Sequence, residues 1–370
     1  MKYRIALVIV CTLATFACGS GTGDQPGTIP AAVRNYTGSA SVGDFFTITL
    51  DPNAQTLTYT DLSNNMTGTV AYTVNADGTL ALSDPNGNLV AAYEVPNYVM
   101  LIQATMTGPN QNTLALVTAV ESTQITPATF ASQKYNYMQF RTSIGGVSIG
   151  AASMDAQTNV TTSSYWPFGE QNQQGAFNIS SMLSSSFQED PSGTFIAIPS
   201  TAGAPSYVFG TPNGIFAVDN PNGTILGLQQ AASKAFVPTY AATYTAMYYR
   251  KANATMGAGS SNTETGTPSM GMATLVIDAS GQFTLTNSSN SVMAQGTLVA
   301  VADTPYLYGS PNELLDPCFG LFTFRVKTAT TQQDVFVTFL NNAVLFSSYK
   351  TLPSVSGNNY YNYFYGVALK

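Results

Sequence analysis

The sequence predicts an all-β protein, and two observations lead to that prediction. Short segments alternate apolar and polar residues, so that in residues 46–50 the side chains of Phe46, Ile48 and Leu50 share one face. A two-residue period of this kind indicates a strand that buries one side. No stretch after Pro30 keeps the apolar spacing of a helix. We therefore expect short strands joined by tight turns.

The turns between these segments have a consistent chemistry. Each combines Asp or Asn with a glycine that can take positive φ, which lets the chain reverse within a few residues. The turn glycines are Gly78, Gly87, Gly193, Gly223 and Gly281. Because the turns return regularly, the strands are expected to be antiparallel.

The order of these features repeats three times along the chain. Each block opens near a proline, continues into a strand rich in tyrosine, and later contains a strand that a glycine leads. The opening prolines are Pro30, Pro127 and Pro238, a second strand ends at Asp51, Asp155 or Asp278, and the leading glycines are Gly68, Gly175 and Gly296. Such self-similarity predicts a repeated structural unit. We predict β repeats over residues 30–122, 123–233 and 234–370.

About eight short antiparallel strands per block allow two architectures. One is a row of three small barrels or sandwiches, and the other is a single β-propeller. The alternation in the early strands of each block favours barrels, because each strand has one buried face. The nearly continuous apolar run at residues 98–102 fits burial on both sides and favours a propeller. We prefer the tandem barrels.

The N-terminus has the features of an export signal. Lys2 and Arg4 precede an apolar run over residues 5–14, and Ala17 stands before Cys18. This arrangement predicts a signal peptide over residues 1–17. Residues 18–29 are rich in Gly and carry no apolar periodicity, so we expect a flexible tether.

Cys18 followed by residues 19–21, Gly-Ser-Gly, resembles the processing site of a bacterial lipoprotein. In that family Thr15 is usually Leu and Phe16 is usually smaller, so ordinary cleavage after Ala17 remains an alternative. The chain is similar to uncharacterised β-rich lipoproteins of Gram-negative bacteria over the signal and Cys18 alone. The resemblance implies a lipid on Cys18 and, with Gly19 rather than Asp, an outer-membrane location; the alternative is a soluble periplasmic or secreted protein.

The composition excludes several classes of function. The chain contains no histidine, which excludes Ser-His-Asp and Cys-His catalysis and histidine metal sites. Lys2 and Arg4 are removed with the signal peptide, so the mature chain keeps 10 of the 12 basic residues. With 19 acidic residues, its net charge is −9. Nucleic acid is then an unfavourable partner. We expect no cofactor and no metal, because phosphate loops, dinucleotide motifs and calcium-loop spacing are all absent from the sequence.

Cys318 is the one cysteine outside the signal and the lipidation site. It cannot form an intramolecular disulfide in the mature lipidated chain. We interpret it as a thiol packed in the core.

Two aromatic clusters and one group of carboxylates are candidate sites. Tyr165, Trp166 and Phe168 lie in a predicted loop and form a candidate surface for a glycan or an envelope protein. The second cluster, residues 360–365, is expected to pack a final strand. The carboxylates of the middle block are Asp155, Glu170, Glu189 and Asp190.

The sequence leaves the molecular activity open. A lipid-anchored envelope protein with a binding or structural role, rather than an enzyme, is the preferred interpretation. The alternative is a carbohydrate-active hydrolase that uses two of the paired carboxylates of the middle block.

Overall fold

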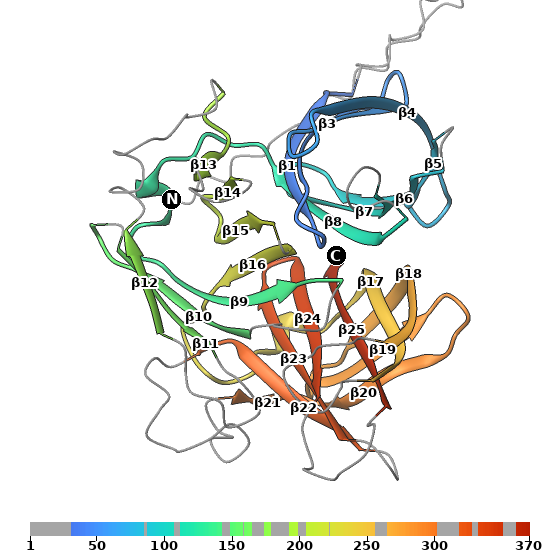
Figure 1. Ribbon diagram of the computed structural model, residues 1–370. Coiled ribbons are helices and arrows are strands. Elements are labelled where there is room, and N and C mark those ends of the chain that lie inside the picture. Colours follow the sequence, from blue (N-terminus) through green and yellow to red (C-terminus); the bar gives the residue numbers. More distant parts are fainter. Residues whose placement is uncertain are drawn as a thin grey trace, which may run out of the picture. The chain divides into compact units, whose positions relative to one another are not determined.

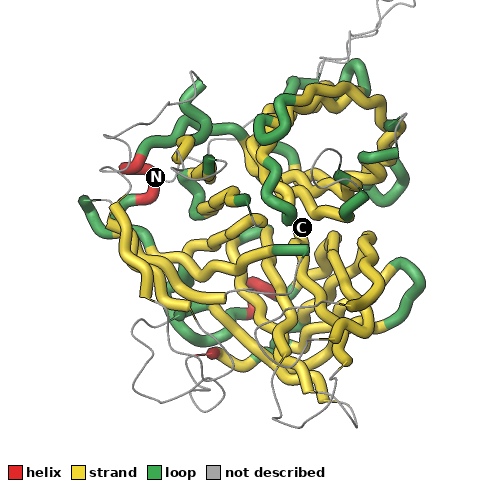
Figure 2. Tube along the Cα trace, in the orientation of Figure 1, coloured by secondary structure: helices red, strands yellow, loops and turns green. Residues whose placement is uncertain are grey.

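The computed structural model describes residues 31–84, 87–106, 112–142, 149–157, 159–164, 174–178, 192–198, 205–221, 223–255, 265–301, 318–327, 332–350 and 360–370. Antiparallel strands dominate these residues, and no α-helix occurs among them (Figure 2). Two short 3-10 segments, η2 (Pro127–Phe130) and η3 (Pro238–Tyr240), begin at the prolines that open the second and third blocks. The all-β prediction is confirmed.

The first eight strands form a closed barrel, which Figure 1 shows end on as a ring. Each strand pairs with its neighbour in sequence, and β8 returns to pair with β1. The strands are β1 (Arg34–Ala40), β2 (Phe45–Asp51), β3 (Thr56–Asp61), β4 (Met66–Val74), β5 (Leu80–Ser83), β6 (Leu89–Val95), β7 (Val99–Thr105) and β8 (Leu114–Glu121). Closure leaves this barrel without a free strand edge.

The next eight strands form a second antiparallel sheet, in the order β12-β11-β10-β9-β16-β15-β14-β13. Its first and last strands pair, as they do in the barrel. No pairing joins β12 to β13 within the described part of the chain. The strands are β9 (Lys134–Phe140), β10 (Ile149–Met154), β11 (Asn159–Ser164), β12 (Gln174–Asn178), β13 (Ile196–Ile198), β14 (Ser206–Thr211), β15 (Ile215–Asn220) and β16 (Gly223–Gln229).

The third sheet has nine strands, in the order β20-β19-β18-β17-β25-β24-β23-β22-β21. Here too the first strand, β17, pairs with the last, β25. The strands are β17 (Ala242–Thr255), β18 (Thr265–Ile277), β19 (Gln282–Asn287), β20 (Val292–Thr297), β21 (Val299–Ala300), β22 (Leu321–Lys327), β23 (Gln332–Leu340), β24 (Ala343–Lys350) and β25 (Tyr360–Leu369).

The threefold repeat is therefore a repeat of whole sheets, and the predicted fold class is confirmed. The glycines that lead a strand occupy the fourth strand of each sheet, β4, β12 and β20. Asp51, Asp155 and Asp278 stand at the turn between the second and third strands. Each accepts a hydrogen bond from the backbone N–H two residues further on, at 2.8–2.9 Å. The exact boundaries between the repeats stay a prediction.

The predicted turn chemistry is also observed. Gly78, Gly87, Gly193, Gly223 and Gly281 all have positive φ, between 67° and 135°. A side chain at positive φ would clash with its own backbone, so glycine is the residue that fits. Asparagine takes this role in other turns, at Asn65, Asn97, Asn112, Asn290 and Asn341.

Apolar residues gather in four clusters. One fills the barrel and another fills the third sheet. The largest draws residues from the outside of the barrel and from both other sheets. Phe45 of the barrel, for example, stacks on Tyr207 of the second sheet with ring centroids 4.2 Å apart. Cys318 belongs to the same cluster and is 1% exposed, so the prediction of a packed thiol is confirmed.

Candidate binding pocket in the barrel

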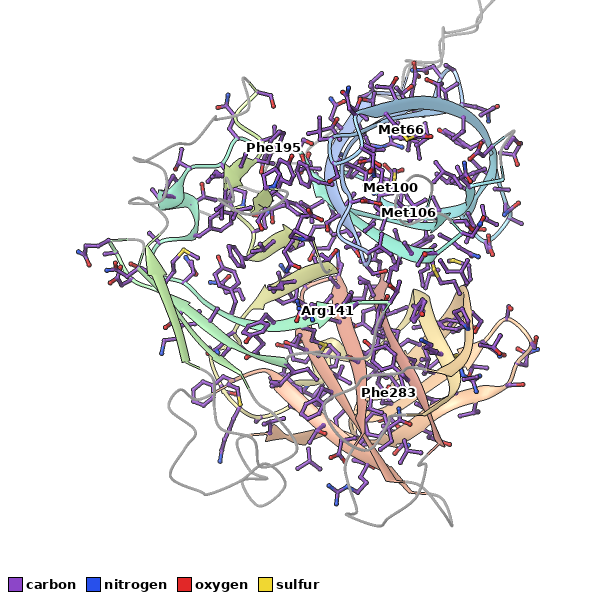
Figure 3. All side chains as sticks on the ribbon, in the orientation of Figure 1. Met66, Met100, Met106, Arg141, Phe195 and Phe283 are labelled. Atoms are coloured by element: carbon purple, nitrogen blue, oxygen red, sulfur yellow. The ribbon has the colours of Figure 1, made fainter. Side chains whose placement is uncertain are left out.

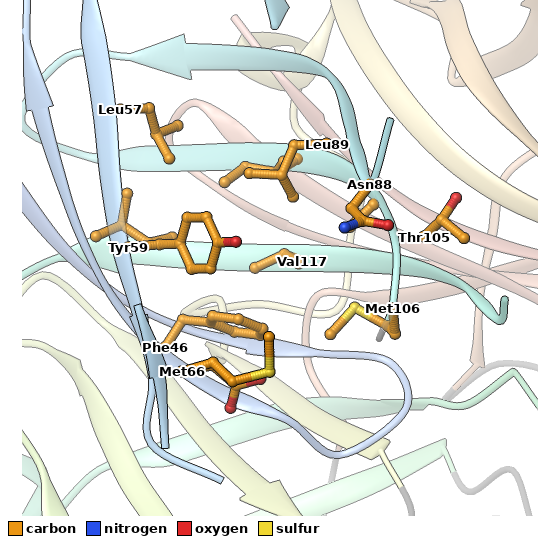
Figure 4. A pocket seen from close by; sticks show the side chains of 13 residues that line it. Phe46, Leu57, Tyr59, Met66, Asn88, Leu89, Thr105, Met106 and Val117 are labelled. Carbon is orange, nitrogen blue, oxygen red and sulfur yellow. The ribbon is translucent and has the colours of Figure 1, made fainter. Parts of the chain in front are cut away.

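A pocket opens at one end of the closed barrel, where β2 begins and β3 ends (Figure 4). Its wall comes from β2, β3, β4, β6, β7 and β8 and from the segment that precedes β6. The lining residues are Phe46, Ile48, Leu57, Tyr59, Asp61, Met66, Asn88, Leu89, Ile102, Ala104, Thr105, Met106 and Val117. Figure 3 shows Met66, Met100 and Met106 inside the ring of strands. The lining is thus mainly apolar, with polar groups from few residues.

The hollow results from an uneven distribution of side-chain sizes inside the barrel. Tyr59 points inward opposite Gly68, and a Cβ at position 68 would lie 2.6 Å from the Tyr59 ring. A side chain at position 68 would therefore displace the end of the Tyr59 ring. On the other wall, β7 contributes the small buried residue Ala104, which pairs with the equally small Ala115 of β8. Small side chains opposite aromatic ones leave the end of the barrel underfilled.

The opposite end of the barrel is closed by a polar cluster. The Arg34 guanidinium donates to both carboxylate oxygens of Glu94, at 2.6 and 2.7 Å. The Tyr36 hydroxyl donates to the same carboxylate. The hydrogen bond to Glu94 raises the pKa of Arg34, and burial, followed by Glu94, raises the pKa of Tyr36. This ion pair lies at the end of the barrel away from the pocket.

Asp61 is the one acidic residue in the pocket wall. It is 4% exposed, and its carboxylate accepts hydrogen bonds from the backbone N–H groups of Ser63 and Asn64 at 3.0 and 3.1 Å. The Asn64 side-chain amide adds a third bond of 2.8 Å. These bonds stabilise the turn between β3 and β4. Asp61 thus has a structural role, and the surface around it is apolar.

This arrangement suits the binding of a short aliphatic group. Eight-stranded barrels can hold one small ligand. The cavity volume is about 40 Å³, enough for about three water molecules and far below the roughly 300 Å³ of a typical small-molecule site. Methionine side chains are flexible, so Met66 and Met106 can adapt to a group that enters.

The candidate residues from the sequence lie elsewhere. Tyr165, Trp166 and Phe168 lie outside the described residues, as do Cys18 and residues 1–30. In the C-terminal aromatic run, the structure describes side chains from Tyr363 onward. Tyr363, Phe364 and Tyr365 are at most 2% exposed, which confirms that they pack the core.

Of the four carboxylates considered for a hydrolase, the structure describes Asp155, which stabilises its own turn. It accepts bonds from the Asn159 backbone at 2.8 Å and from the Asn159 side chain at 2.6 Å, and these bonds lower its pKa. Glu170, Glu189 and Asp190 lie outside the described residues. Within the described part of the chain, no three Asp, Glu or Cys residues are grouped so as to hold a metal ion.

The pocket itself was not predicted. The sequence indicated that Phe46, Ile48 and Leu50 share a buried face, and Gly68 marked a special strand. Neither signal reports the volume left between eight strands, because that volume depends on side chains up to 71 positions apart in the sequence, as from Phe46 to Val117.

Comparisons with known proteins give no family. No protein-family model matches the sequence, and no curated protein is significantly similar to it. A double mutant of the vaccine antigen transferrin-binding protein B from Haemophilus parasuis is 7% identical, with a TM-score of 0.27, over 92% of this chain and 76% of that chain. Intact Ap-TbpB, with its N and C lobes, is 9% identical, with a TM-score of 0.21, over 91% and 77%. These TM-scores are too low to support an argument.

The residues that the structure describes include no helix with the length and apolar character of a membrane span.

Proposed function

We propose that this protein is a lipid-anchored envelope protein that binds a short aliphatic group of its partner at the open end of the N-terminal barrel. The observation that carries the proposal is the mainly apolar, methionine-lined pocket in a barrel whose other end is closed by Arg34, Tyr36 and Glu94. Such a pocket provides apolar contact area, and its one carboxylate, Asp61, is engaged by the turn between β3 and β4. A binding role therefore fits it better than catalysis.

The envelope location is supported by the N-terminal sequence. Lys2, Arg4 and the apolar run are typical of an export signal, and Cys18 followed by Gly19 resembles a lipoprotein processing site. A flexible tether over residues 18–29 would hold the β body away from the membrane. The barrel starts only a few residues beyond that tether, at Arg34.

The lipid anchor can be tested separately from binding. Cells that produce the protein with radiolabelled palmitate are expected to yield a labelled mature chain, and Cys18→Ser is expected to abolish the label. Cys11→Ser is the matched control, because Cys11 leaves with the signal peptide and its replacement should preserve labelling. An unlabelled mature chain that starts at an unmodified Cys18 would contradict the anchor and favour plain secretion.

Binding can be tested by NMR with methionines labelled at the methyl carbon. Titration with straight-chain alcohols from butanol to octanol is expected to shift the signals of Met66 and Met106, which line the pocket. Met154 and Met247 belong to other core clusters and serve as internal controls. Equal shifts of all four signals would indicate nonspecific binding and contradict the proposal.

A variant that fills the pocket sharpens this test. Ala104 is 1% exposed and lines the cavity, so Ala104→Leu should occupy the space and abolish the Met66 and Met106 shifts. Val90→Leu adds a methylene group on a residue that is 46% exposed and should leave binding unchanged. If Ala104→Leu does not fold, Met66→Ala should change the preferred chain length by widening the mouth.

A further inference from the structure

A second hollow, separate from the barrel pocket, lies where β16 ends against the turn between β23 and β24. We call it the amide groove and define it by Gln229, Gln230, Thr239, Tyr240, Phe339 and Asn341. Its volume is about 310 Å³, at the lower end of the range of roughly 300–1,000 Å³ that small-molecule sites occupy. The residues come from the second sheet, from η3 and from the third sheet.

The two glutamines of the groove are held in place through their amide nitrogens. Gln229 Nε2 donates to Gln133 Oε1 at 2.5 Å, and Gln230 Nε2 donates to Asn136 Oδ1 at 3.2 Å. Asn136 is fixed in turn, because its own amide donates to the Phe319 carbonyl at 2.7 Å. The carbonyl oxygens of both glutamines therefore stay available as hydrogen-bond acceptors with little freedom left to lose.

Tyr240 and Phe339 give the same groove an aromatic lining. The rings of Tyr240 and Phe339 stack with centroids 4.5 Å apart and planes at 11°. Phe236 packs on Phe339 edge-on at 6.1 Å, which holds the stack from another side. Burial raises the pKa of Tyr240, so its hydroxyl keeps its proton at neutral pH and can donate or accept a hydrogen bond. The wall thus presents a fixed ring with a polar edge.

Among the residues that the structure describes, no charged side chain lines the groove. Lys370 donates from Nζ to the Thr239 carbonyl at 3.2 Å and lies over the Tyr244 ring at 5.3 Å. In both contacts the Lys370 ammonium group binds groups of the protein. A charged ligand that enters the groove would lose its hydration and gain no partner of opposite charge. A neutral ligand with many hydroxyls would have a much smaller desolvation cost.

We propose that the amide groove binds an uncharged saccharide of about one or two rings, a size that the volume range of small-molecule sites allows. The apolar face of a sugar ring packs on Tyr240, and its hydroxyls donate to Gln229 and Gln230 and bond with the Asn341 amide. Asn341 is exposed at the tip of the turn and is positioned to contact the outer ring. This site is independent of the barrel pocket and of the lipid anchor.

The test is calorimetric titration of the full mature protein with maltose, cellobiose and N,N′-diacetylchitobiose. At least one of the three is expected to bind, whereas galacturonic acid and glucosamine, which carry a charge at neutral pH, should not. Heat from none of the neutral sugars, or equal affinity for the charged ones, overturns the proposal. A polymer such as chitin or amylose that competes with the bound disaccharide would identify an envelope or external polysaccharide as the source.

Two variants connect binding to the groove. Asn341→Gly removes one amide at a residue with a φ of 48°, and loss of one or two hydrogen bonds should weaken affinity about threefold to tenfold. Asn290→Gly is the matched control, because Asn290 is also an exposed turn residue with positive φ, at 58°. Tyr240→Leu removes the flat ring and should abolish binding. Affinity that is unchanged in Asn341→Gly overturns the proposal even if Tyr240→Leu does not fold.

Discussion

At the scale of single residues, Asp219 is an unusual feature of the molecule, because it is an acid with 1% exposure. The Ser39 hydroxyl donates to the Asp219 carboxyl at 2.5 Å and contacts the Thr224 hydroxyl, and Thr224 donates to the Ala40 carbonyl at 2.9 Å. Burial raises the pKa of Asp219 to about 8, and the nearby charge of Asp44 adds to this. The protonated form of Asp219 carries no charge in this buried position. These hydrogen bonds connect β1 of the barrel to β15 and β16 of the second sheet.

The Asp219 carboxyl should make stability depend on pH. Its pKa is near 3.8 when unfolded and about 8 when folded, so the folded state holds the extra proton between these values. Stability should therefore be highest near pH 4 and fall as the pH rises towards 8. Asp219→Asn should remove this slope and raise the melting temperature at pH 8. Thermal unfolding from pH 4 to pH 9 measures both effects.

The control for this prediction is Asp155→Asn. Asp155 is a turn residue whose pKa is lowered, so its proton is gained only below about pH 4 and its replacement should leave the slope between pH 4 and 8 intact. A slope that survives in Asp219→Asn would show that Asp219 is ionised in the folded protein.

The Arg34–Glu94 pair gives a second prediction at this scale. The side chains are 17% and 8% exposed, so solvent screens the pair only in part. Glu94→Gln should lower the free energy of unfolding by about 1–3 kcal/mol, because it leaves Arg34 and the Tyr36 hydroxyl without their charged acceptor. Urea denaturation measures the loss. The double variant with Arg34→Met should recover part of it, and a double variant that loses the sum of both single effects would exclude coupling.

At the scale of elements, the third sheet requires a glycine at one position beside β17. Tyr248 on β17 stands between Gly271 on β18 and Gly366 on β25. A Cβ at Gly366 would lie 2.4 Å from the Met247 carbonyl oxygen, whereas a Cβ at Gly271 would lie 3.4 Å from the Tyr248 hydroxyl oxygen and 3.6 Å from its ring. Backbone cannot move aside as a side chain can. The two glycines flank the same residue but differ in what surrounds them.

Gly366→Ala should therefore destabilise the third sheet by about 1–3 kcal/mol through overpacking. Gly271→Ala is the matched control and should change stability by much less, because its new methyl group makes a close to ordinary contact. Chemical denaturation of the two variants compares them directly. Equal losses would mean that the cost comes from strand backbone preference and not from the contact with β17.

At the scale of the whole molecule, the three sheets share a core. Residues 32–370 form one compact unit, and the largest apolar cluster takes side chains from all three sheets. Phe45 of the barrel stacks on Tyr207, and Phe140 of the second sheet stacks on Tyr365 of the third at 4.8 Å. The outside of β7 is buried as well as its inside. We therefore expect the sheets to be coupled in stability.

Phe45→Ala tests this coupling. Phe45 is 0% exposed, and its loss should cost about 3–5 kcal/mol. Hydrogen exchange should then accelerate in β14 of the second sheet as well as in the barrel. Phe283→Ala is the control, because Phe283 belongs to the third sheet's own core and its loss should leave β14 and the barrel protected. Faster exchange confined to β1–β8 would show that the barrel folds independently.

Much of the fold could be predicted, and the reason is that its signals are local. Alternation identified the strands, and the glycines that were placed in turns all have positive φ. The apolar run at residues 98–102 was the misleading element, since it favoured a propeller. Val99 and Leu101 face the shared core while Met100 and Ile102 face the barrel interior, so burial on both sides has another cause.

The sequence by itself determined the all-β class, the three blocks and the turns, because a strand's period and a turn's glycine depend only on neighbouring residues. Only the tertiary structure decided that the first sheet closes and that its interior is underfilled beside Met66 and Met106. It alone brought Gln230 to Asn341 across the amide groove and buried Asp219 against Ser39. Closure, cavity volume and burial depend on side chains far apart in the sequence, and no local pattern reports their sum.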